Sequence, residues 1–231
     1  MYAKFLKRVL DIFLSLLALT VLSPVLVVLM IVGAIAMKGN PFFTQLRPGK
    51  FDKKTGQEKI FRLIKFRTMS NAKDRNGNLL PDEIRLNRYG KLLRSTSLDE
   101  LPELLNILIG DMSIIGPRPQ LVRDMVFMSD TQRMRHSVRP GLSGLAQVNG
   151  RNNITWEEKF EYDLTYIEKI SFMTDARLVL QTVCKVFKRA DTVREGTASD
   201  MDFGDWLMAN GSVDRETYDK KQEEAKELMK G

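Results

Sequence analysis

The sequence predicts an α+β protein that is mainly α-helical, with an N-terminal helix hairpin that re-enters a membrane and a small membrane-associated domain after it. Three observations lead to this expectation: a long uncharged apolar segment, two short stretches that alternate basic and apolar residues, and several later stretches with helical spacing. A chain of 231 residues is long enough for one domain with a hydrophobic core and an anchor. We expect a membrane segment at residues 1–38, a domain at 39–190 and a polar acidic tail at 191–231.

The segment from Ile12 to Met37 carries no charge and is almost entirely apolar. As a helix it would be about 39 Å long, which suffices to cross a hydrocarbon core of about 30 Å with some tilt. It is too long for the hydrophobic part of a signal peptide, and no A-x-A cleavage site follows it. Its length also argues against a buried core helix, so the segment predicts insertion into a membrane.

Ser23 and Pro24 lie in the middle of this segment, where a proline removes a backbone hydrogen bond and bends or breaks a helix. Both flanks are basic: Lys4, Lys7 and Arg8 precede the segment, and Lys38 and Arg47 follow it. The positive-inside rule is satisfied if both ends stay on the cytoplasmic side. This favours a helix-break-helix that dips into one leaflet and returns, although the physical argument leaves a kinked spanning helix open.

The remaining elements follow from periodicity. Basic-apolar alternation predicts strands at residues 41–47 and 59–67, joined by a turn at 53–56, and a loop rich in Asn and Gly covers 74–78. Helical spacing predicts helices at 98–109, 122–136, 156–170 and 174–188. A charged helix with acid–base pairs at helical spacing is expected at 215–229, in a peripheral position.

The net charge of +7 is unevenly distributed. From Arg47 to Arg94 the chain has 14 Lys and Arg against 5 Asp and Glu, whereas from Glu195 onward it has 5 against 10. A basic middle suits the phosphates of a nucleotide, a nucleic acid or a lipid headgroup. The single Cys184 excludes an intramolecular disulfide, and the single His136 argues against a histidine metal site and a Ser-His-Asp triad.

Three segments contain residues suited to chemistry. Ser97 and Glu100 match a capping box, which would place Asp99 and Glu100 at a helix start; in a second register Pro102 is the first helical residue and the acids lie just outside. Either register favours the ionised carboxylates that a nucleophile or a metal ligand needs, but from this motif alone a plain helix start is the better explanation.

Gly116-Pro-Arg-Pro119 places Arg118 between two prolines, which restrict the backbone around a guanidinium suited to phosphate. The segment from Arg139 to Arg151 is rich in glycine and uncharged polar residues, a composition that brings backbone N–H groups close to a ligand, although it lacks the P-loop pattern. A stiff loop and a turn-rich connector are the structural alternatives. Arg94, Lys65 and Arg67 extend the basic surface.

Several motifs occur together and in order. They are the Ser-Pro-broken hydrophobic segment, Phe43-Thr-Gln-Leu-Arg-Pro-Gly49, Lys65-Phe-Arg-Thr-Met69, Leu93-Arg-Ser-Thr-Ser-Leu-Asp-Glu-Leu-Pro102, Gly110-Asp-Met-Ser-Ile-Ile-Gly-Pro-Arg-Pro119 and Val138-Arg-Pro-Gly-Leu-Ser-Gly-Leu-Ala-Gln-Val-Asn-Gly-Arg151. From about Tyr2 to Arg189 the chain resembles the bacterial sugar transferase family, the monotopic polyprenyl-phosphate phosphoglycosyl transferases. Its size is similar to that of the small Campylobacter-type members that serve N-linked protein glycosylation.

This resemblance implies a re-entrant membrane helix broken at Ser23-Pro24 and a catalytic phosphoglycosyl transferase domain at residues 39–190. It implies that Asp99 attacks the β-phosphate of a UDP-sugar and releases UMP, forming a covalent aspartyl phosphosugar. Undecaprenyl phosphate then displaces the aspartate and becomes undecaprenyl-diphosphate-sugar. The reaction, which requires Mg²⁺, is the first membrane step of a bacterial glycoconjugate pathway at the cytoplasmic face of the inner membrane.

On this basis Asp99 is expected to be the nucleophile and a Mg²⁺ ligand, and Glu100 a positioning group or base. The expected phosphate and substrate ligands are Arg94, Arg118, Lys65, Arg67, Arg139, Gln147 and Arg151, and the expected structural residues are Ser23, Pro24, Pro117 and Pro119. The expected partners are a UDP-sugar, undecaprenyl phosphate and membrane lipids, without nucleic acid. A homodimer, the identity of the sugar and the pathway are left open.

Three rival functions rank well below the transferase. A membrane-anchored nucleic-acid or lipid-binding module would use the basic surface without turnover and would bind less tightly as salt increases. A membrane-associated hydrolase would use the acidic pair but not the lipid acceptor. A structural anchor would be indifferent to Asp99→Asn.

Overall fold

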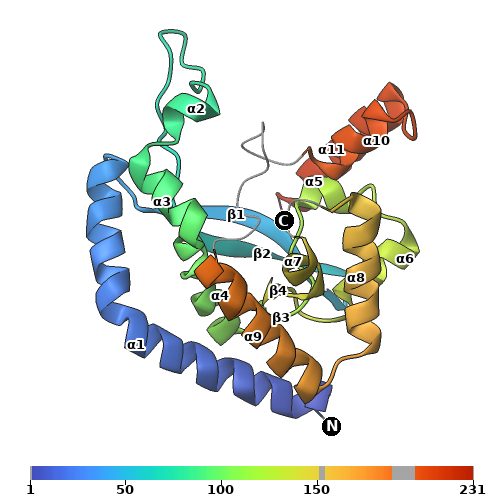
Figure 1. The fold of residues 1–231 in the computed structure, drawn as a ribbon. Coiled ribbons are helices and arrows are strands. Elements are labelled where there is room, and N and C mark those ends of the chain that lie inside the picture. The colour runs from blue at the N-terminus through green and yellow to red at the C-terminus, as the bar shows by residue number, and fades with distance from the viewer. Residues whose placement is uncertain (1, 151–153, 189–200, 231) are drawn as a thin grey trace.

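A long apolar helix runs along the outside of the molecule (Figure 1). The computed structural model describes residues 2–150, 154–188 and 201–230. Its first element is the π-helical turn η1 (Tyr2–Leu6), which continues into α1 (Lys7–Ala36). Among the described residues, these 35 form the one helix whose length and composition would allow it to cross a membrane.

Helix α1 is bent but unbroken. Figure 1 shows its first part passing beneath the domain and its second part turning up along one side. Pro24, inside the helix, has no N–H to offer the carbonyl of Thr20 four residues earlier, and the Ser23 hydroxyl donates a hydrogen bond to that carbonyl at 2.8 Å. The predicted break at Ser23-Pro24 is therefore wrong in form: the structure has a bend inside one continuous helix, because a side-chain hydroxyl replaces the missing donor.

The first turns of α1 are fastened to the domain by charged groups. Lys7 Nζ lies 2.6 Å from Asp175 Oδ2, and both side chains are largely buried. Asp11 is only 4% exposed and accepts a hydrogen bond from the Ser113 hydroxyl at 2.8 Å. Burying these groups at the edge of an apolar helix is tolerated because each is paired.

The last turns of α1 are fastened to the same domain. The Tyr89 hydroxyl donates to the Leu29 carbonyl at 2.8 Å, and the Asn87 amide donates to the Ala36 carbonyl at 3.1 Å. Close packing also occurs at Gly33, where an added Cβ would lie 2.7 Å from the Tyr89 hydroxyl oxygen. Both ends of the bent helix therefore rest on one body.

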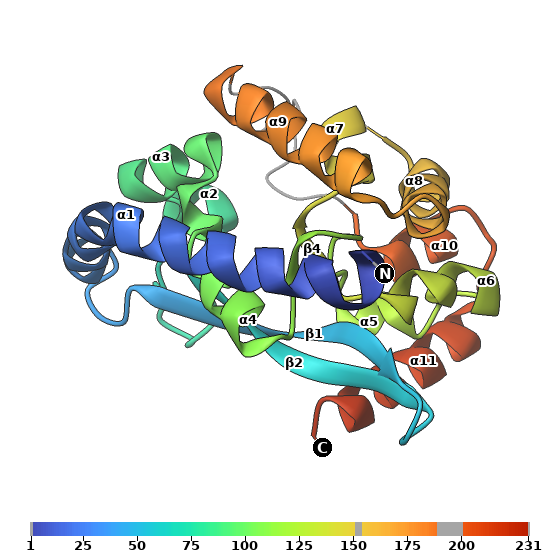
Figure 2. The ribbon, with the colours of Figure 1, turned by 90° about the horizontal axis from the view of Figure 1, so that it is seen from below.

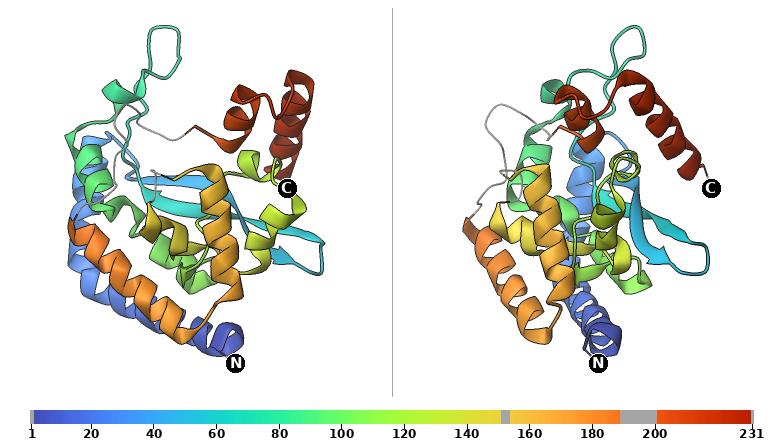
Figure 3. Two further views of the ribbon diagram at one scale, coloured as in Figure 1. Left: turned by 45° about the vertical axis from the view of Figure 1, so that its right-hand side comes forward. Right: turned by 90° about the vertical axis from the view of Figure 1, so that its right-hand side faces the viewer.

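Strands β1 (Phe42–Asp52) and β2 (Gln57–Phe66) form an antiparallel hairpin. This confirms the two predicted strands and the turn between them, although β1 is longer than expected and contains an irregularity between Pro48 and Phe51. Phe61 and Leu63, two residues apart on β2, are both 3% exposed and face the core, as a period of two requires. Figure 3 shows the turn of this hairpin extending from the body of the molecule.

A helical segment follows the hairpin. It comprises α2 (Asp82–Arg85), α3 (Arg88–Thr96), the 3₁₀ turn η2 (Leu98–Glu100) and α4 (Glu103–Ile109). Asn87 caps α3 by accepting the Gly90 N–H at 2.9 Å, and α4 ends at Gly110, whose φ of 101° favours glycine. Leu93 of α3 and Ile107 of α4 are completely buried and join these helices to the core.

The central segment is less regular than predicted. It comprises β3 (Ser113–Ile115), α5 (Val122–Met125), α6 (Asp130–Arg133), the 3₁₀ turn η3 (Met134–Ser137) and β4 (Gly141–Ser143), with β3 parallel to β4. The single helix predicted at 122–136 is wrong, because Ser129 and Gln132 form a capping box that starts a new helix within it. The two strands approach closely: a Cβ on Gly141 would lie 2.1 Å from the Gly116 nitrogen.

Three helices complete the part before the tail: α7 (Leu145–Asn149), α8 (Trp156–Glu168) and α9 (Phe172–Lys188). The last two confirm the predicted helices. Thr155 and Glu158 form a capping box at the start of α8, with the Thr155 N–H donating to the Glu158 carboxylate at 2.7 Å. In the view from below, α1 and α9 both cross the near side of the molecule (Figure 2).

The tail contributes α10 (Phe203–Ala209) and α11 (Arg215–Leu228), the second of which confirms the predicted charged helix. These helices lie at the edge of the molecule (Figure 1) but are docked on it. The Phe203 N–H donates to the buried Asp124 carboxylate at 2.9 Å, and the Phe203 ring packs against Trp156 with centroids 5.1 Å apart. Ala225 of α11 is completely buried against α5.

Candidate active site

The acidic pair Asp99 and Glu100 lies in the short turn η2 between α3 and α4. The capping box predicted at Ser97 and Glu100 is wrong. Ser97 ends α3 in a left-handed conformation, with a φ of 57°, and makes no side-chain cap to η2. The acids lie outside α4, as in the second predicted register, but Pro102 occupies the position before the first helical residue.

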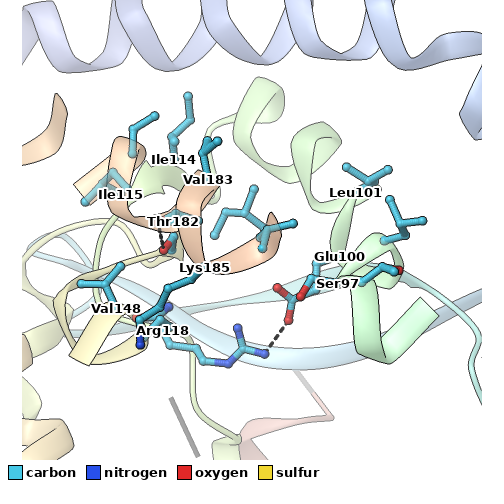
Figure 4. A pocket seen from close by; sticks show the side chains of 17 residues that line it. Ser97, Glu100, Leu101, Ile114, Ile115, Arg118, Val148, Thr182, Val183 and Lys185 are labelled. Atoms are coloured by element: carbon cyan, nitrogen blue, oxygen red, sulfur yellow. Dashed lines mark hydrogen bonds and ion pairs between the residues drawn. The ribbon is translucent and has the colours of Figure 1, made fainter. Parts of the chain in front are cut away.

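The carboxylate of Glu100 faces cations instead of the backbone. Its Oε1 lies 2.6 Å from Arg118 Nη2 and 3.1 Å from Lys65 Nζ, and the Arg118 contact is drawn in Figure 4. Lys65 Nζ also lies 3.0 Å from Glu103 Oε1. Four charged side chains therefore meet beside Asp99: Lys65 from β2, Glu100 from η2, Glu103 from α4 and Arg118 from the loop after β3.

Glu103 was not among the predicted site residues. It is 2% exposed, the first residue of α4, and its carboxylate belongs to the same cluster. A carboxylate surrounded by leucines in Leu101-Pro-Glu-Leu-Leu105 is the sequence signal that points to it, since an acid in an apolar stretch needs a partner when buried.

The electrostatics of the cluster differ from the prediction. Burial raises the pKa of Asp99, and the charge of Glu100 raises it further, whereas Lys65 and Arg118 oppose the shift. Burial likewise raises the pKa of Glu103. The charge of Glu100 raises the pKa of Arg118 despite the opposing effect of burial. For Asp99, burial and neighbouring charges therefore outweigh the backbone, and the pKa is raised instead of lowered as expected from a helix start.

The loop between β3 and α5 carries Arg118 between Pro117 and Pro119, as the sequence indicates. The Pro117 carbonyl accepts a hydrogen bond from the Gly141 N–H at 2.9 Å, and the Pro119 carbonyl accepts one from Arg47 at 3.0 Å. The glycines of the segment after Arg139 thus have a packing role, because they let β4 approach the loop that carries Arg118.

Two predicted phosphate ligands, Arg67 and Arg139, have backbone partners in the structure. Arg67 donates to the Phe42 carbonyl at 3.1 Å and fastens the end of β1, and Arg139 donates to the Gly110 carbonyl at 2.8 Å at the end of α4. These contacts give both arginines a structural task outside the carboxylate cluster.

Arg94 lies on α3, one turn before the acidic pair. It donates to the Thr68 hydroxyl at 3.1 Å and to the Met69 sulfur at 3.0 Å, which directs it toward the segment after β2. Arg151, the other predicted ligand, lies outside the described residues.

A pocket of about 310 Å³ opens beside the cluster. Glu100, Arg118 and Gln147 are among the polar residues in its wall, and the branched apolar side chains of β3 and α9 contribute much of its apolar surface. In Figure 4, Ile114 and Val183 lie toward α1, and the Glu100–Arg118 pair lies on the side away from it. The pocket therefore has an apolar part on the side of α1 and a polar part at the acids.

Gln147 is the unusual group in this pocket. It is 8% exposed, and neither its amide nitrogen nor its amide oxygen has a hydrogen-bond partner among the described residues. A buried amide without partners costs free energy on the order of 1–3 kcal/mol. Among the described residues, Gln147 therefore has unused hydrogen-bonding capacity at the wall of the pocket.

The donor set fits Mg²⁺. No group of three or more His, Cys, Asp or Glu side chains suited to a metal occurs in the part of the chain that the structure describes. Magnesium, however, takes one or two carboxylates and completes its shell with phosphate oxygens and waters. Asp99 and Glu100 would supply that number, and a cation beside them would relieve the repulsion that raises the pKa of Asp99.

Comparison with known proteins identifies the family. Residues 2–189 match the family described as bacterial sugar transferase. The "Uncharacterized sugar transferase EpsL" of Bacillus subtilis is 45% identical over 183 residues, which cover 78% of this chain and 87% of that protein.

Two further relatives have names that state an activity. The "UDP-glucose:undecaprenyl-phosphate glucose-1-phosphate transferase" of Klebsiella pneumoniae is 39% identical over 191 residues, and the "UDP-N-acetylgalactosamine-undecaprenyl-phosphate N-acetylgalactosaminephosphotransferase" of Aeromonas hydrophila is 34% identical over 188 residues. Each match covers 78% of this chain but only 40% and 43% of those longer proteins, respectively. With the family matched over residues 2–189, the chain belongs to the bacterial sugar transferases.

Proposed function

We propose that this protein transfers a sugar phosphate from a UDP-sugar to undecaprenyl phosphate, releasing UMP, as the first membrane step of a bacterial glycoconjugate pathway. The observation that carries the proposal is the cluster of Asp99, Glu100, Lys65 and Arg118 at the polar end of an apolar pocket. Two relatives have names that include a UDP-sugar and undecaprenyl phosphate, which supports the same substrates for this protein.

In the first step, a carboxylate oxygen of Asp99 forms a bond to the β-phosphorus of the UDP-sugar. The bond between that phosphorus and the oxygen bridging it to the α-phosphorus breaks, and UMP leaves with the electron pair. The product is an aspartyl phosphosugar. Lys65 and Arg118, whose charges act on Asp99, help keep it ionised and neutralise charge as the phosphate bond breaks.

Glu100 positions Arg118 through the 2.6 Å contact, which aims the guanidinium at the place where a phosphate would lie beside Asp99. Asp99 and Glu100 would hold Mg²⁺, which supplies charge neutralisation at the diphosphate when bound. The buried Glu103 holds Lys65 from the other side at 3.0 Å.

In the second step, a phosphate oxygen of undecaprenyl phosphate attacks the same phosphorus, and the bond to Asp99 breaks and restores the carboxylate. The apolar part of the pocket supports this acceptor. Ile114 and Leu142, which line it, pack in one cluster with Ala18 and Leu19 of α1, so an isoprene chain leaving the membrane helix would meet an apolar wall. The Gln147 amide would then donate to the lipid phosphate.

The attachment of α1 supports a re-entrant, monotopic placement. Its two ends are fastened to one domain by Lys7–Asp175 and Tyr89–Leu29, whereas a helix that crossed the bilayer would carry its ends to opposite sides. Only 11% of the most apolar 18-residue stretch of this helix is buried in the protein, so most of its surface is available to contact lipid. Basic residues on both flanks of α1 support a location of the domain on the cytoplasmic face.

Helix α9 would share this membrane contact. Met173 and Leu180 are 74% and 68% exposed, and α9 crosses the same side of the molecule as α1 (Figure 2). Large exposed apolar side chains on neighbouring helices mark a surface that water does not cover.

The topology is tested by cysteine labelling in a Cys184→Ser background, because Cys184 is exposed. Single cysteines at Tyr2 and Asn40 are labelled in sealed inverted vesicles and in intact spheroplasts. We expect both positions to react from the cytoplasmic side; labelling from opposite sides contradicts the re-entrant placement.

The activity is tested by measuring UMP release from a panel of UDP-sugars, with detergent-solubilised protein, Mg²⁺ and undecaprenyl phosphate. We expect repeated turnover that requires the lipid and disappears in Asp99→Asn, while Asp82→Asn in the exposed helix α2 keeps it. Radiolabelled UDP-sugar without lipid should label the wild-type protein but not Asp99→Asn. Release of UDP would overturn the mechanism, and sugar phosphate released equally without lipid would indicate a hydrolase.

A further inference from the structure

We propose that Arg135, paired with Asp163, is a positioning residue that fixes the backbone of Arg118, an inference that rests on the proposed function. Arg135 is 2% exposed, and its Nη2 donates both to the Arg118 carbonyl at 2.7 Å and to Asp163 Oδ2 at 2.5 Å. Arg118 is thus held at two places: its guanidinium contacts Glu100, and its main-chain carbonyl accepts a hydrogen bond from Arg135.

The loop needs such donors because of its prolines. Pro117 and Pro119 have no N–H, so the segment can be held mainly through its carbonyl oxygens. All three successive carbonyls are held: Pro117 by the Gly141 N–H at 2.9 Å, Arg118 by Arg135 at 2.7 Å, and Pro119 by Arg47 at 3.0 Å. Two of these donors are arginine side chains from other parts of the chain, and that of Arg135 is buried.

Stability alone gives a poor reason for the buried pair. Burying an ion pair often stabilises no more than apolar residues of the same volume would. Here Arg135 Nε and Nη1 and Asp163 Oδ1 also lack hydrogen-bond partners among the described residues, which adds to the cost. The pair does hold a hydrogen-bond donor at the Arg118 carbonyl, so we assign it a role in positioning that loop.

The expected consequence is a loss of turnover with little loss of substrate affinity. Arg135→Met keeps most of the volume but removes the donor, so the loop is released at its middle carbonyl. A displacement of a catalytic group by about 1 Å lowers rates by about 100-fold. We expect kcat to fall by roughly 30- to 100-fold with KM for the UDP-sugar within about twofold, since the lost interaction matters most in the transition state.

Arg133 provides a matched control. It lies two residues away, and its guanidinium pairs with the buried Glu58 instead of the Arg118 loop. Arg133→Met should therefore lower the unfolding temperature but keep kcat within about twofold. Arg135→Lys, which keeps one cationic donor, should recover part of the kcat lost in Arg135→Met. If Arg135 only filled space in the core, restoring the charge would not restore kcat.

The experiment compares these variants with the wild type by UMP release and by hydrogen exchange of the peptide covering residues 116–121. We expect faster exchange of that peptide and a lower kcat in Arg135→Met and in Asp163→Asn, but not in Arg133→Met. Unchanged exchange, or activity that falls only with the unfolded fraction, overturns the positioning role. Absence of UMP release in the wild type would overturn the proposed function instead, while the exchange result would still decide the role of Arg135.

Discussion

Replacing Lys65 by methionine should expose how strongly the acidic cluster depends on one ammonium group. Lys65 Nζ contacts Glu103 Oε1 at 3.0 Å and Glu100 Oε1 at 3.1 Å. Glu100 keeps Arg118 as a partner in the variant, but Glu103, only 2% exposed, loses the one cation with which the structure pairs it among the described residues.

The magnitude follows from the geometry. At 3.0 Å and an effective dielectric constant of about 20, the attraction between two unit charges is about 5 kcal/mol. Removing Lys65 also removes the cost of desolvating its ammonium group, so we expect a net loss of about 3 kcal/mol in the free energy of unfolding. For a protein of this size that corresponds to an unfolding temperature roughly 6 to 12 °C lower.

The loss should depend on pH in one direction. Burial already raises the pKa of Glu103 above its ordinary value, and Lys65 opposes that shift, so its removal raises the pKa further. Near pH 4.5 the carboxyl is largely protonated in the folded variant and costs little. As pH rises to 7 the unfolded chain releases its proton more readily than the folded one, so the deficit of the variant grows.

The assay is denaturant unfolding of detergent-solubilised wild type, Lys65→Met, Glu103→Gln and the double variant between pH 4.5 and 7. The double variant should recover most of the lost stability, because no buried carboxylate is left unpaired. Lys59→Met on the same strand is the control, since Lys59 is largely exposed. A Lys65→Met protein as stable as the wild type at pH 7, or a deficit that does not change with pH, would refute the reasoning.

Three further substitutions have expected outcomes. Ser23→Ala should lower the free energy of unfolding by about 1 kcal/mol, because the Thr20 carbonyl loses the hydroxyl that replaces the proline's missing donor. Burial acts to raise the pKa of Glu58, but hydrogen bonds with His136 and Arg133 lower it to about 2. The free energy of unfolding should therefore fall as the pH drops from about 4.5 to about 2. Glu58→Gln should flatten that decline and lower the free energy of unfolding at pH 7 by on the order of 2 kcal/mol. Phe203→Ala should lower the free energy of unfolding by about 3 kcal/mol through the cavity it leaves.

Two of these substitutions have a matched control, and each has a result that would contradict it. Ser95→Ala removes a similar hydroxyl-to-carbonyl bond, to Leu92, in a helix without a nearby proline, and an equal loss there would argue against the special role of Ser23. A Glu58→Gln protein with the wild-type acid profile would contradict the assigned pKa. Phe51→Ala, at a 41% exposed position, should change stability little, and a loss as large as that of Phe203→Ala would mean that burial does not explain the effect.

The capping motifs show where local sequence reasoning succeeds and fails. The same pattern of a hydroxyl followed three residues later by glutamate occurs at Thr155–Glu158, where it forms a capping box, and at Ser97–Glu100, where it does not. At the second place Glu100 faces Lys65 and Arg118, which attract a carboxylate more strongly than a backbone N–H does. A local pattern gives way when distant charges compete for the same side chain.

The remaining differences have the same origin. The hairpin and helices α8 and α9 could be predicted because their periodicity decides them locally. The acidic pair and Arg118 could be predicted from motifs in the chain. The apolar surroundings of Glu103 signal a buried acid, but its pairing with Lys65, 38 residues away, has no local signal. The same holds for the contact of Arg135 with the Arg118 carbonyl, 17 residues away.

The two anchorages of α1 make it a brace, held at Asp175 near one end and at Tyr89 near the other. Because α1 is attached to the domain near both ends, it cannot change its depth in a bilayer unless the domain moves with it. Under the proposed membrane placement, the height of Asp99 above the lipid surface is therefore set by the same rigid frame. The acyl-chain length of the surrounding lipid then becomes a control on whether a lipid phosphate reaches the nucleophile.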